Sequence, residues 1–211
     1  KVRAMGWDAY FDSRFAEPSA AAEEYMQVLA SRAEALRGRS RFAHAPDDDN
    51  MLKVCTDGRK LGLDIELLPG MRPEHPETVT KLVLAADNIA AIYHRTRNVS
   101  IPGSPVPGLS QIVMCDLGTP RADGTQTYGR LRALLLARGV PAAHMRFAHD
   151  AKSAKARQAM FSSCRSGHLP IIFGSTPLIG ESANLQTRCT ALHQLDLTWA
   201  PAAFQQRVGR A

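Results

Sequence analysis

The sequence has 211 residues, of which 45% are hydrophobic and 22% are charged. These fractions are near those of ordinary globular domains, and they exclude a collagen-like chain and a disordered chain. No apolar run reaches the roughly 18 residues that a membrane-spanning helix needs, so we expect no membrane partner. The length favours one domain, or one domain with an appendage.

The charge of the sequence is positive and unevenly distributed. There are 26 Lys and Arg against 20 Asp and Glu, a net charge of +6. Residues 1–120 carry 14 basic and 16 acidic side chains, residues 121–168 carry 9 and 2, and residues 169–211 carry 3 and 2. If the basic side chains of the middle segment share one face, they would attract a polyanion such as nucleic acid. Solvated helix faces are the commoner arrangement of such a run.

The cysteines predict neither a metal site nor a disulfide framework. They are Cys55, Cys115, Cys164 and Cys189, without a CxxC pair or another spacing typical of metal ligands. A reduced, cytoplasmic chain is the simpler expectation. The segment Lys1–Tyr10 has neither an initiating Met nor the apolar core of a signal peptide, so we expect this chain to be part of a longer protein.

The first half of the sequence predicts helices joined by loops. One helix is expected from Ser19, as its N-cap, to Leu36, with Ala20, Tyr25, Val28 and Leu29 near one side. A loop follows over Arg37–Asn50, then a shorter helix around Gly58–Leu67 and a proline-rich linker over Pro69–Pro76. A further amphipathic helix is expected over Thr78–Arg97, with an apolar face of Val79, Leu82, Val83, Ala86, Ile89, Ala90 and Tyr93.

Beyond the polar loop Asn98–Ser110 the pattern changes to alternating strands and helices. Apolar runs predict buried strands at Gln111–Cys115, Val140–Ala148, Leu169–Phe173 and Thr190–Leu195. Helices are expected from Tyr128 to Gly139, from a cap at Asp150 to about Arg165, and from Pro201 onward. This alternation predicts an α/β fold, a parallel sheet with helices on both faces.

A parallel sheet places its functional loops at the carboxyl ends of its strands. The first such loop is Asp116-Leu117-Gly118-Thr119-Pro120. The second contains Gly174-Ser175-Thr176, Gly180 and Asn184-Leu185-Gln186, and the third contains Asp196, Trp199-Ala200-Pro201 and Gln206-Arg207-Val208-Gly209-Arg210. In this order the motifs resemble the C-terminal RecA-like lobe of superfamily 2 helicases and translocases, most closely the Swi/Snf-like branch. The combination is specific, although each motif alone is weak.

The region before this lobe resembles the equivalent region of large helicase and DNA-methylase proteins of bacterial mobile elements. The residues concerned are Asp49–Lys53, Asp57–Lys60 and Leu63–Asp64. The resemblance covers roughly Asp49–Ala211, whereas residues 1–48 contain no recognisable motif. It leaves open whether a methylase domain shares the polypeptide.

The resemblance implies a RecA-like sheet preceded by a helical extension. We expect a helical accessory region and linker at residues 1–76 and the lobe at residues 77–211, which ends inside its last motif. The lobe would be the second motor lobe of an ATP-dependent nucleic-acid helicase or translocase, with DNA as the expected polymer and RNA as the alternative. An N-terminal RecA-like lobe of the same polypeptide would be its partner.

The resemblance also implies roles for individual residues. Arg210 corresponds to the arginine finger, with Arg207 beside it as a second catalytic residue, and an arginine there fits phosphate oxygens without losing its charge. Gln206, Gly180 and Asn184 correspond to nucleotide-binding positions. Thr119, Ser175 and Thr176 correspond to residues that contact the nucleic-acid backbone, and basic side chains that could flank it are Arg121, Arg130, Arg132, Arg146, Lys152, Lys155 and Arg157.

The parts of the motor that bind most of the nucleotide are missing from this sequence. It contains no G-x-x-x-x-G-K-[ST] loop and no apolar strand ending in paired acids. ATP and Mg²⁺ would therefore be bound mainly by the first lobe, and this fragment alone is expected to be inactive.

Two departures from the family pattern favour an alternative. Ser182 stands where a second glycine is usual, and Glu181 adds a negative charge to the same loop. The alternative is a non-catalytic RecA-like module that binds nucleic acid or a protein. A stand-alone doubly wound nucleotide-binding enzyme is less well supported, because no Gly-rich loop follows the first strand. Thr119, without the resemblance, would also fit an ordinary turn.

Overall fold

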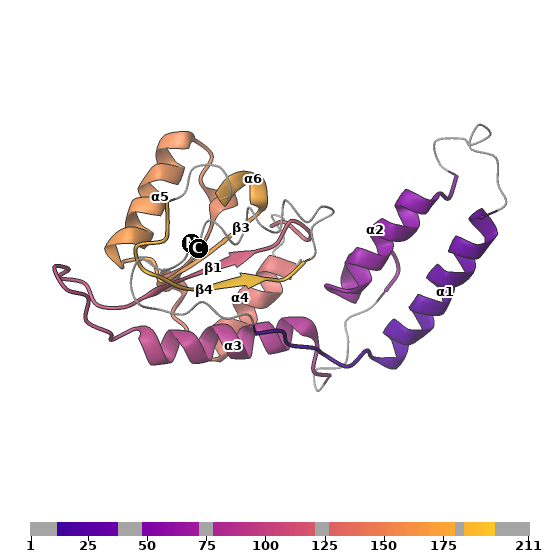
Figure 1. Ribbon diagram of the computed structural model, residues 1–211, viewed down its shortest axis with the longest axis horizontal. Helices are drawn as coiled ribbons and strands as arrows, with labels where there is room; N and C mark the ends of the chain where they lie inside the picture. The colour runs from indigo at the N-terminus through magenta and orange to yellow at the C-terminus, as the bar shows by residue number, and fades with distance from the viewer. Residues whose placement is uncertain (1–11, 38–47, 72–77, 121–126, 180–183, 197–211) are drawn as a thin grey trace.

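The computed structural model describes residues 12–37, 48–71, 78–120, 127–179 and 184–196 (Figure 1). Two helices, α1 (Ala20–Leu36) and α2 (Met51–Leu61), precede an α/β lobe that begins with α3 (Lys81–Thr96). The lobe continues with β1 (Ser110–Met114), α4 (Thr127–Ala137), β2 (Met145–Phe147), α5 (Ala154–Ser166), β3 (Ile171–Gly174), α6 (Thr176–Ile179) and β4 (Cys189–Gln194). No helix in the described ranges is long and apolar enough to cross a membrane.

The four strands form one parallel sheet in the order β2-β3-β1-β4. In the centre, Val113 of β1 is paired with Phe173 of β3 and with His193 of β4. The predicted parallel α/β fold is confirmed. In Figure 1 the carboxyl ends of β1 and β4 point toward the end of the molecule that carries α1 and α2.

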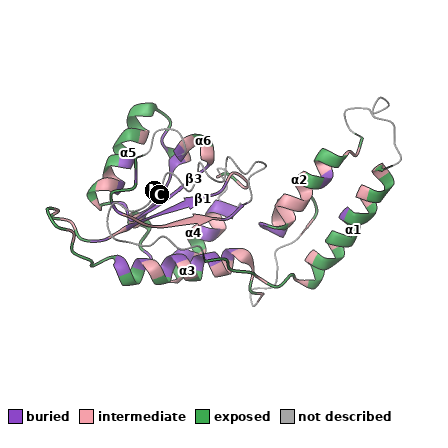
Figure 2. Cartoon of the chain, viewed as in Figure 1, coloured by how far each residue is buried: buried purple, intermediate pink, exposed green. Residues whose placement is uncertain are grey.

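Each face of the sheet is covered by its own apolar core. Val113 and Phe173 pack with the inner sides of α3 and α4, including Tyr128. Ile112 and Ile172 point the other way and pack with α5 and α6. Successive residues of a strand point to opposite faces, so a strand covered on both sides is apolar throughout. The buried residues in Figure 2 accordingly concentrate in the sheet and on the facing sides of its helices.

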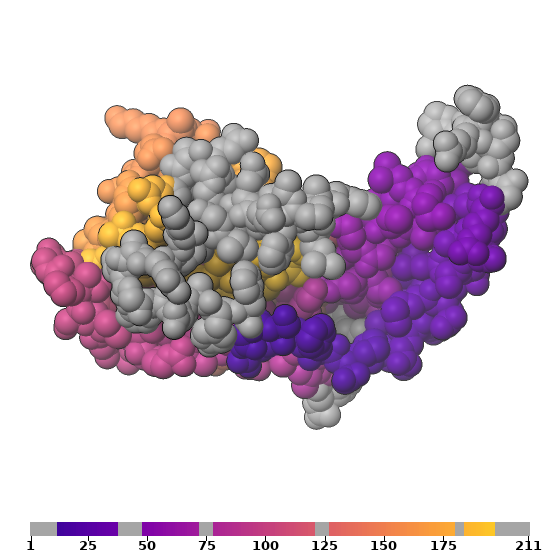
Figure 3. All heavy atoms as spheres, viewed as in Figure 1, coloured from indigo at the N-terminus to yellow at the C-terminus, as the bar shows by residue number. Residues whose placement is uncertain are grey.

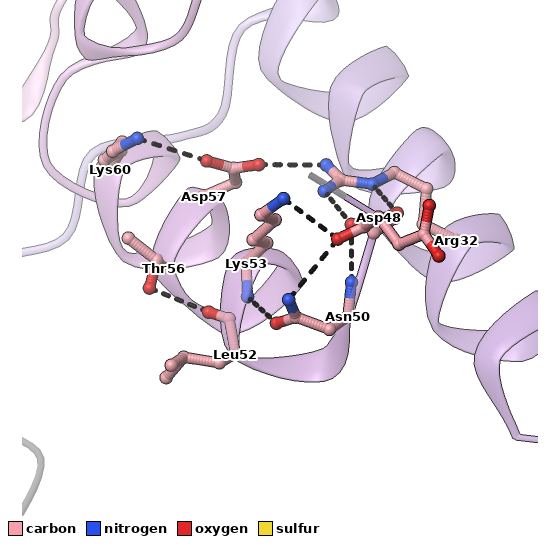
Figure 4. A network of polar contacts seen from close by, with 9 residues as sticks. Arg32, Asp48, Asn50, Leu52, Lys53, Thr56, Asp57 and Lys60 are labelled. Carbon is pink, nitrogen blue, oxygen red and sulfur yellow. Dashed lines mark hydrogen bonds and ion pairs between the residues drawn. The ribbon is translucent and has the colours of Figure 1, made fainter. Parts of the chain in front are cut away.

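The α1–α2 pair is held mainly by charged groups. The Arg32 guanidinium of α1 donates two hydrogen bonds of 2.7 Å to the Asp49 carboxylate and one of 3.0 Å to Asp57 of α2 (Figure 4). Asp57 also pairs with Lys60 at 3.2 Å. Leu29 lies against Gly58, whereas the neighbouring Val28, expected on the same apolar side, is 46% exposed.

Several predicted boundaries were wrong for identifiable reasons. The helix expected around Gly58–Leu67 is α2, which begins at Met51 because the Asn50 side chain accepts a hydrogen bond from Lys53 N. Gly58 lies inside this helix, and the residues after it form only a short 3-10 turn, η1 (Ile65–Leu67).

Other predicted boundaries in the lobe also differ from the observed ones. The helix expected to be capped by Asp150 is α5, and its N-cap is Ser153, whose hydroxyl accepts from Ala156 N. The strand expected over Val140–Ala148 is reduced to β2, since a 3-10 turn follows Pro141. The helix expected over Thr78–Arg97 is α3, and Val79 precedes it and is exposed. The helix expected from Pro201 lies outside the described residues.

Candidate functional site

Three strand-end loops of the sheet are joined by two aspartates. Asp116 follows β1, Thr176 follows β3 and Asp196 follows β4. Asp116 and Asp196 were part of the predicted loops, but no role was assigned to them from the sequence. In the structure each carboxylate accepts hydrogen bonds from a neighbouring loop. The loops therefore form one hydrogen-bonded unit at the carboxyl edge of the sheet.

Asp196 fixes the loop that follows β1. Its Oδ2 atom accepts a hydrogen bond of 2.8 Å from Asp116 N and one of 3.0 Å from Leu117 N. Asp196 is only 5% exposed, and a buried carboxylate needs such donors to offset its desolvation. The position of the first loop thus depends on β4.

Asp116 in turn fixes the loop that follows β3. Its Oδ1 accepts a hydrogen bond of 2.6 Å from Thr176 N, and its Oδ2 accepts one of 3.0 Å from Thr176 Oγ1. Both bonds are made by the first residue of α6, whose next turn is closed by bonds from Leu178 N and Ile179 N to Ser175 O. The aspartate therefore sets where the second loop begins.

The first loop packs tightly against the start of α4. Gly118 has a φ of +61°, and a Cβ atom placed on it would lie 2.2 Å from Thr127 Oγ1. Only glycine fits there, both for its backbone conformation and for the close approach. Tyr128 adds a hydrogen bond from its hydroxyl to Cys115 O.

A lysine lies near the same edge. Lys81, the first residue of α3, donates a hydrogen bond of 2.8 Å from Nζ to Gly62 O, just beyond α2. Burial lowers the pKa of Lys81, and the charges of Asp196 and Cys115 partly oppose this effect. The lysine connects the helical extension to the lobe at the strand ends.

The structure brings together some of the predicted site residues. Thr119 is exposed in the first loop, and Ser175 is buried beside Thr176. The Thr176 hydroxyl donates its proton to Asp116, so a contact with a phosphate oxygen would require it to rotate. Asn184 is exposed, and its backbone oxygen accepts a hydrogen bond of 3.4 Å from Arg165 of α5. Gly180, Gln206, Arg207 and Arg210 lie outside the described residues.

The basic residues of α4 are mostly engaged within the protein. Arg130 Nη1 lies 2.6 Å from Asp64 Oδ1 and 2.5 Å from Glu66 Oε1. Arg138 Nε lies 2.6 Å from Asp87 Oδ1. The guanidinium carbon of Arg132 is 5.9 Å from the centre of the Phe147 ring. These side chains therefore contribute little to a surface for a polyanion.

The basic residues near β2 and the start of α5 differ from those of α4 in exposure and in ion pairing. Arg146, Lys152 and Lys155 are exposed, and we find no ion pair to any of them within the described ranges. Arg157 donates a hydrogen bond of 3.2 Å to Ala151 O. Lys152 and Lys155 follow the carboxyl end of β2, on the same edge of the sheet as the three loops. This edge thus carries part of the exposed positive charge that makes no ion pair within the described residues.

The comparison with protein families bears on this region. Residues 124–211 match the helicase conserved C-terminal domain. A search of curated proteins found no match. The match includes β2, β3 and β4, while β1 lies before it but forms the centre of the same sheet. Residues 124–211 are therefore similar to a helicase C-terminal domain, and the RecA-like fold expected from the sequence is confirmed.

The positions of Asp116 and Asp196 in the sequence could have predicted a role at the strand ends. Each follows closely on an apolar strand run, where parallel sheets bring side chains from different strands together. Their bonding partners are 60 and 80 residues away in the sequence. The sequence shows where these two aspartates lie, but it does not show which distant residues donate hydrogen bonds to them.

Proposed function

We propose that this chain supplies the second motor lobe of an ATP-dependent nucleic-acid helicase or translocase of the Swi/Snf-like branch of superfamily 2, acting on DNA. The match of residues 124–211 to the helicase C-terminal domain is the observation that carries the proposal. An N-terminal RecA-like lobe of the same polypeptide would bind ATP, and closure of the two lobes would bring Arg210 and Arg207 to the nucleotide. Gln206, Gly180 and Asn184 are assigned to the same cleft.

The hydrogen-bonded loops support a mechanical role for this edge. Asp196 holds the first loop and Asp116 holds the second, so a movement of one loop changes the position of the others. Thr119 and the exposed Lys152 and Lys155 lie on this edge, where neutral and cationic donors position a phosphate backbone without reading bases. Ser175 and Thr176 of the second loop remain proposed contacts of the nucleic-acid backbone.

The described carboxylates do not fit a magnesium site as they stand. Asp116 and Asp196 accept hydrogen bonds from backbone N–H groups and from the Thr176 hydroxyl, so these oxygens already have donors. We assign Mg²⁺ to the first lobe, where it would neutralise charge on the nucleotide phosphates. In this lobe the corresponding charge would come from the arginines of the last motif.

The arginine finger is tested in the polypeptide that carries both lobes. Arg210→Ala is expected to lower DNA-stimulated ATP hydrolysis by about 10³-fold or more, because an arginine finger stabilises charge that develops on the transferred phosphate. The matched control is Arg14→Ala, which removes an exposed arginine paired only with Asp12 in the described structure. Unchanged hydrolysis in Arg210→Ala would contradict the assignment.

The basic edge is tested on the 211-residue chain with a DNA oligonucleotide. The double variant Lys152→Ala/Lys155→Ala is expected to weaken binding and to reduce the dependence of log affinity on log salt by about two, since each phosphate contact contributes roughly one to this slope. Arg37→Ala, at the exposed end of α1, is the control. An unchanged slope in the double variant would rule out these lysines as phosphate contacts.

The alternative is a RecA-like lobe that binds nucleic acid or a protein without contributing to hydrolysis. Ser182 and Glu181 favour it, because they change the loop that senses the nucleotide in the family. The alternative predicts DNA binding by the intact polypeptide without ATP hydrolysis. Substitution of Ser182 by glycine would then not restore turnover.

A further inference from the structure

The segment between α2 and the linker lies against the lobe, although it precedes the matched domain by about sixty residues. Leu63 belongs to the apolar core of the lobe, and Leu67 of η1 packs against that core. Between them Asp64 caps η1 by accepting a hydrogen bond of 3.2 Å from Glu66 N. The short turn is thus anchored in the lobe by its apolar residues before any charge is considered.

The Asp64 carboxylate makes contacts that apolar anchoring does not require. Its side chain is only 4% exposed, and its Oδ1 lies 2.6 Å from Arg130 Nη1. Its Oδ2 accepts a hydrogen bond of 3.2 Å from Thr127 Oγ1. A buried ion pair is costly, and apolar residues of similar volume in place of both partners are often at least as stabilising. Its chemistry therefore calls for an explanation beyond docking.

Thr127 connects Asp64 to the first strand-end loop. Its Oγ1 and Cβ atoms lie 2.2 Å and 2.7 Å from the position that a Cβ on Gly118 would take, and Leu67 Cδ2 lies 3.3 Å from it. The backbone of the loop therefore rests directly on the Thr127 side chain. Because Asp64 accepts the hydrogen bond from Oγ1, it fixes the side-chain rotamer against which Gly118 packs.

The loop is thereby held on two sides. Asp196 of the third loop binds Asp116 N and Leu117 N, and the Asp64–Thr127 contact supports Gly118 from the opposite end. Thr119, the predicted nucleic-acid contact, is the exposed residue that follows. In the space-filling view α1 and α2 lie beside the lobe (Figure 3), and the segment after α2 contacts the lobe through Leu63 and Leu67.

We propose that Asp64 is a positioning residue of the motor lobe, which holds the loop Asp116–Pro120 through Thr127 and Gly118 so that Thr119 faces the nucleic-acid backbone. The proposal rests on the proposed function for its DNA contact, but its structural part is independent of DNA. Arg130 compensates the buried carboxylate and is not a phosphate ligand in this arrangement. The segment Leu63–Leu67 of the accessory region is thus connected to the motor lobe at the strand ends.

The experiment uses two conservative variants of the 211-residue chain and one matched control. Asp64→Asn keeps the size of the side chain and removes its charge, and Thr127→Val keeps the shape and removes the hydroxyl. The control is Asp87→Asn, which breaks another aspartate–arginine pair, between the exposed Asp87 of α3 and Arg138 just beyond α4. Melting temperature confirms that each variant is folded.

The first measurement is hydrogen exchange of the backbone amides of residues 116–119. Asp64→Asn and Thr127→Val are each expected to accelerate it about tenfold, because a hydrogen bond to a charged group is lost behind the loop. Asp87→Asn is expected to leave it unchanged. Unaltered exchange in both test variants would overturn the proposal.

The second measurement is binding of a single-stranded DNA oligonucleotide. Asp64→Asn is expected to weaken binding about fivefold to tenfold, and Thr119→Ala is expected to add little in that background, because the two changes remove one contact. Fully additive losses would overturn the positioning role and leave Asp64 as a stabilising residue only. Faster exchange in a chain whose unaltered form binds no DNA would contradict the proposed function while supporting the positioning of the loop.

Discussion

In the α/β lobe the central strands β1 and β3 are buried on both faces, whereas the α1–α2 pair buries only Leu29 and Val54 among its described apolar side chains. Met26 and Leu52 of the pair are exposed, and its principal cross-contact is the ion-pair network of Arg32. Salt does not screen apolar burial, whereas it screens partly exposed ion pairs. The two regions should therefore respond differently to substitutions, pH and salt.

The largest effect is expected in the aromatic core of the lobe. Phe173 is 1% exposed and packs edge-on against Phe147 at 5.3 Å between ring centres. Phe173→Ala is expected to lower the free energy of unfolding by about 3–5 kcal/mol, as measured by urea denaturation. The control is Phe15→Ala, at a residue that is 85% exposed, for which the change should be within about 0.5 kcal/mol. A small effect in Phe173→Ala would contradict the claim that burial stabilises the lobe.

The next effect is a pH dependence that should be confined to the lobe. His193 Nε2 lies 2.8 Å from Gln111 Oε1, and the Gln111 amide donates to Ile89 O at 3.0 Å. Burial lowers the pKa of His193 to about 4, so the neutral form is favoured in the folded state. The unfolded chain then binds more protons between this pKa and the ordinary value near 6.5, and stability must fall as the pH decreases across that window.

We expect this loss to be about 2 kcal/mol, which is less than the full shift implies because β4 is only half-buried. Denaturation of the unaltered chain and of His193→Gln at pH 7 and pH 4.5 measures it. The variant should lose less stability on acidification than the unaltered chain. His168→Gln, at an exposed histidine, should behave as the unaltered chain does. Equal losses in all three proteins would exclude His193 as the cause.

The smallest effect, and the most local one, is expected in the helical pair. Arg32→Gln is expected to accelerate amide exchange in α1 and α2 about fivefold while leaving exchange in β1 and β3 unchanged, since it removes charge-assisted bonds of intermediate exposure. The hydrogen bond from Arg32 also lowers the pKa of Asp49. The stabilisation by this ion pair is therefore complete above the ordinary carboxyl pKa and is lost as the pH falls through the lowered pKa of Asp49. Raising the salt concentration should reproduce part of the variant's effect. Acceleration throughout the sheet would show that the pair and the lobe unfold together.

The predictions from sequence succeeded where the signal was local. Ser19 was correctly expected to cap the first helix, because capping depends on hydrogen bonds within one turn. The apolar run that became β3 was recognised for a similar reason, since a strand buried on both faces shows no polar alternation.

The failures concern features that depend on distant partners. One exception is the late start predicted for α2, which missed the local cap at Asn50, whose side chain accepts from Lys53 N. The bond between Asp57 and Arg32 of another helix does depend on a distant partner. For the same reason Arg130 was grouped with the possible phosphate-flanking residues, although Asp64 and Glu66 engage it. The roles of Arg210 and Arg207 stay predictions, since these residues lie outside the described structure.

The sequence by itself determined the parallel α/β architecture and the order of the three loops, because apolar periodicity and strand-end motifs are read along the chain. Only the tertiary structure decided that Asp116, Asp196 and Asp64 connect these loops to one another and to the helical extension. Asp64 and Thr127 are 63 residues apart, and Asp116 and Thr176 are 60 apart. A hydrogen bond across such a separation is selected by the folded geometry of the whole lobe, which no local pattern specifies.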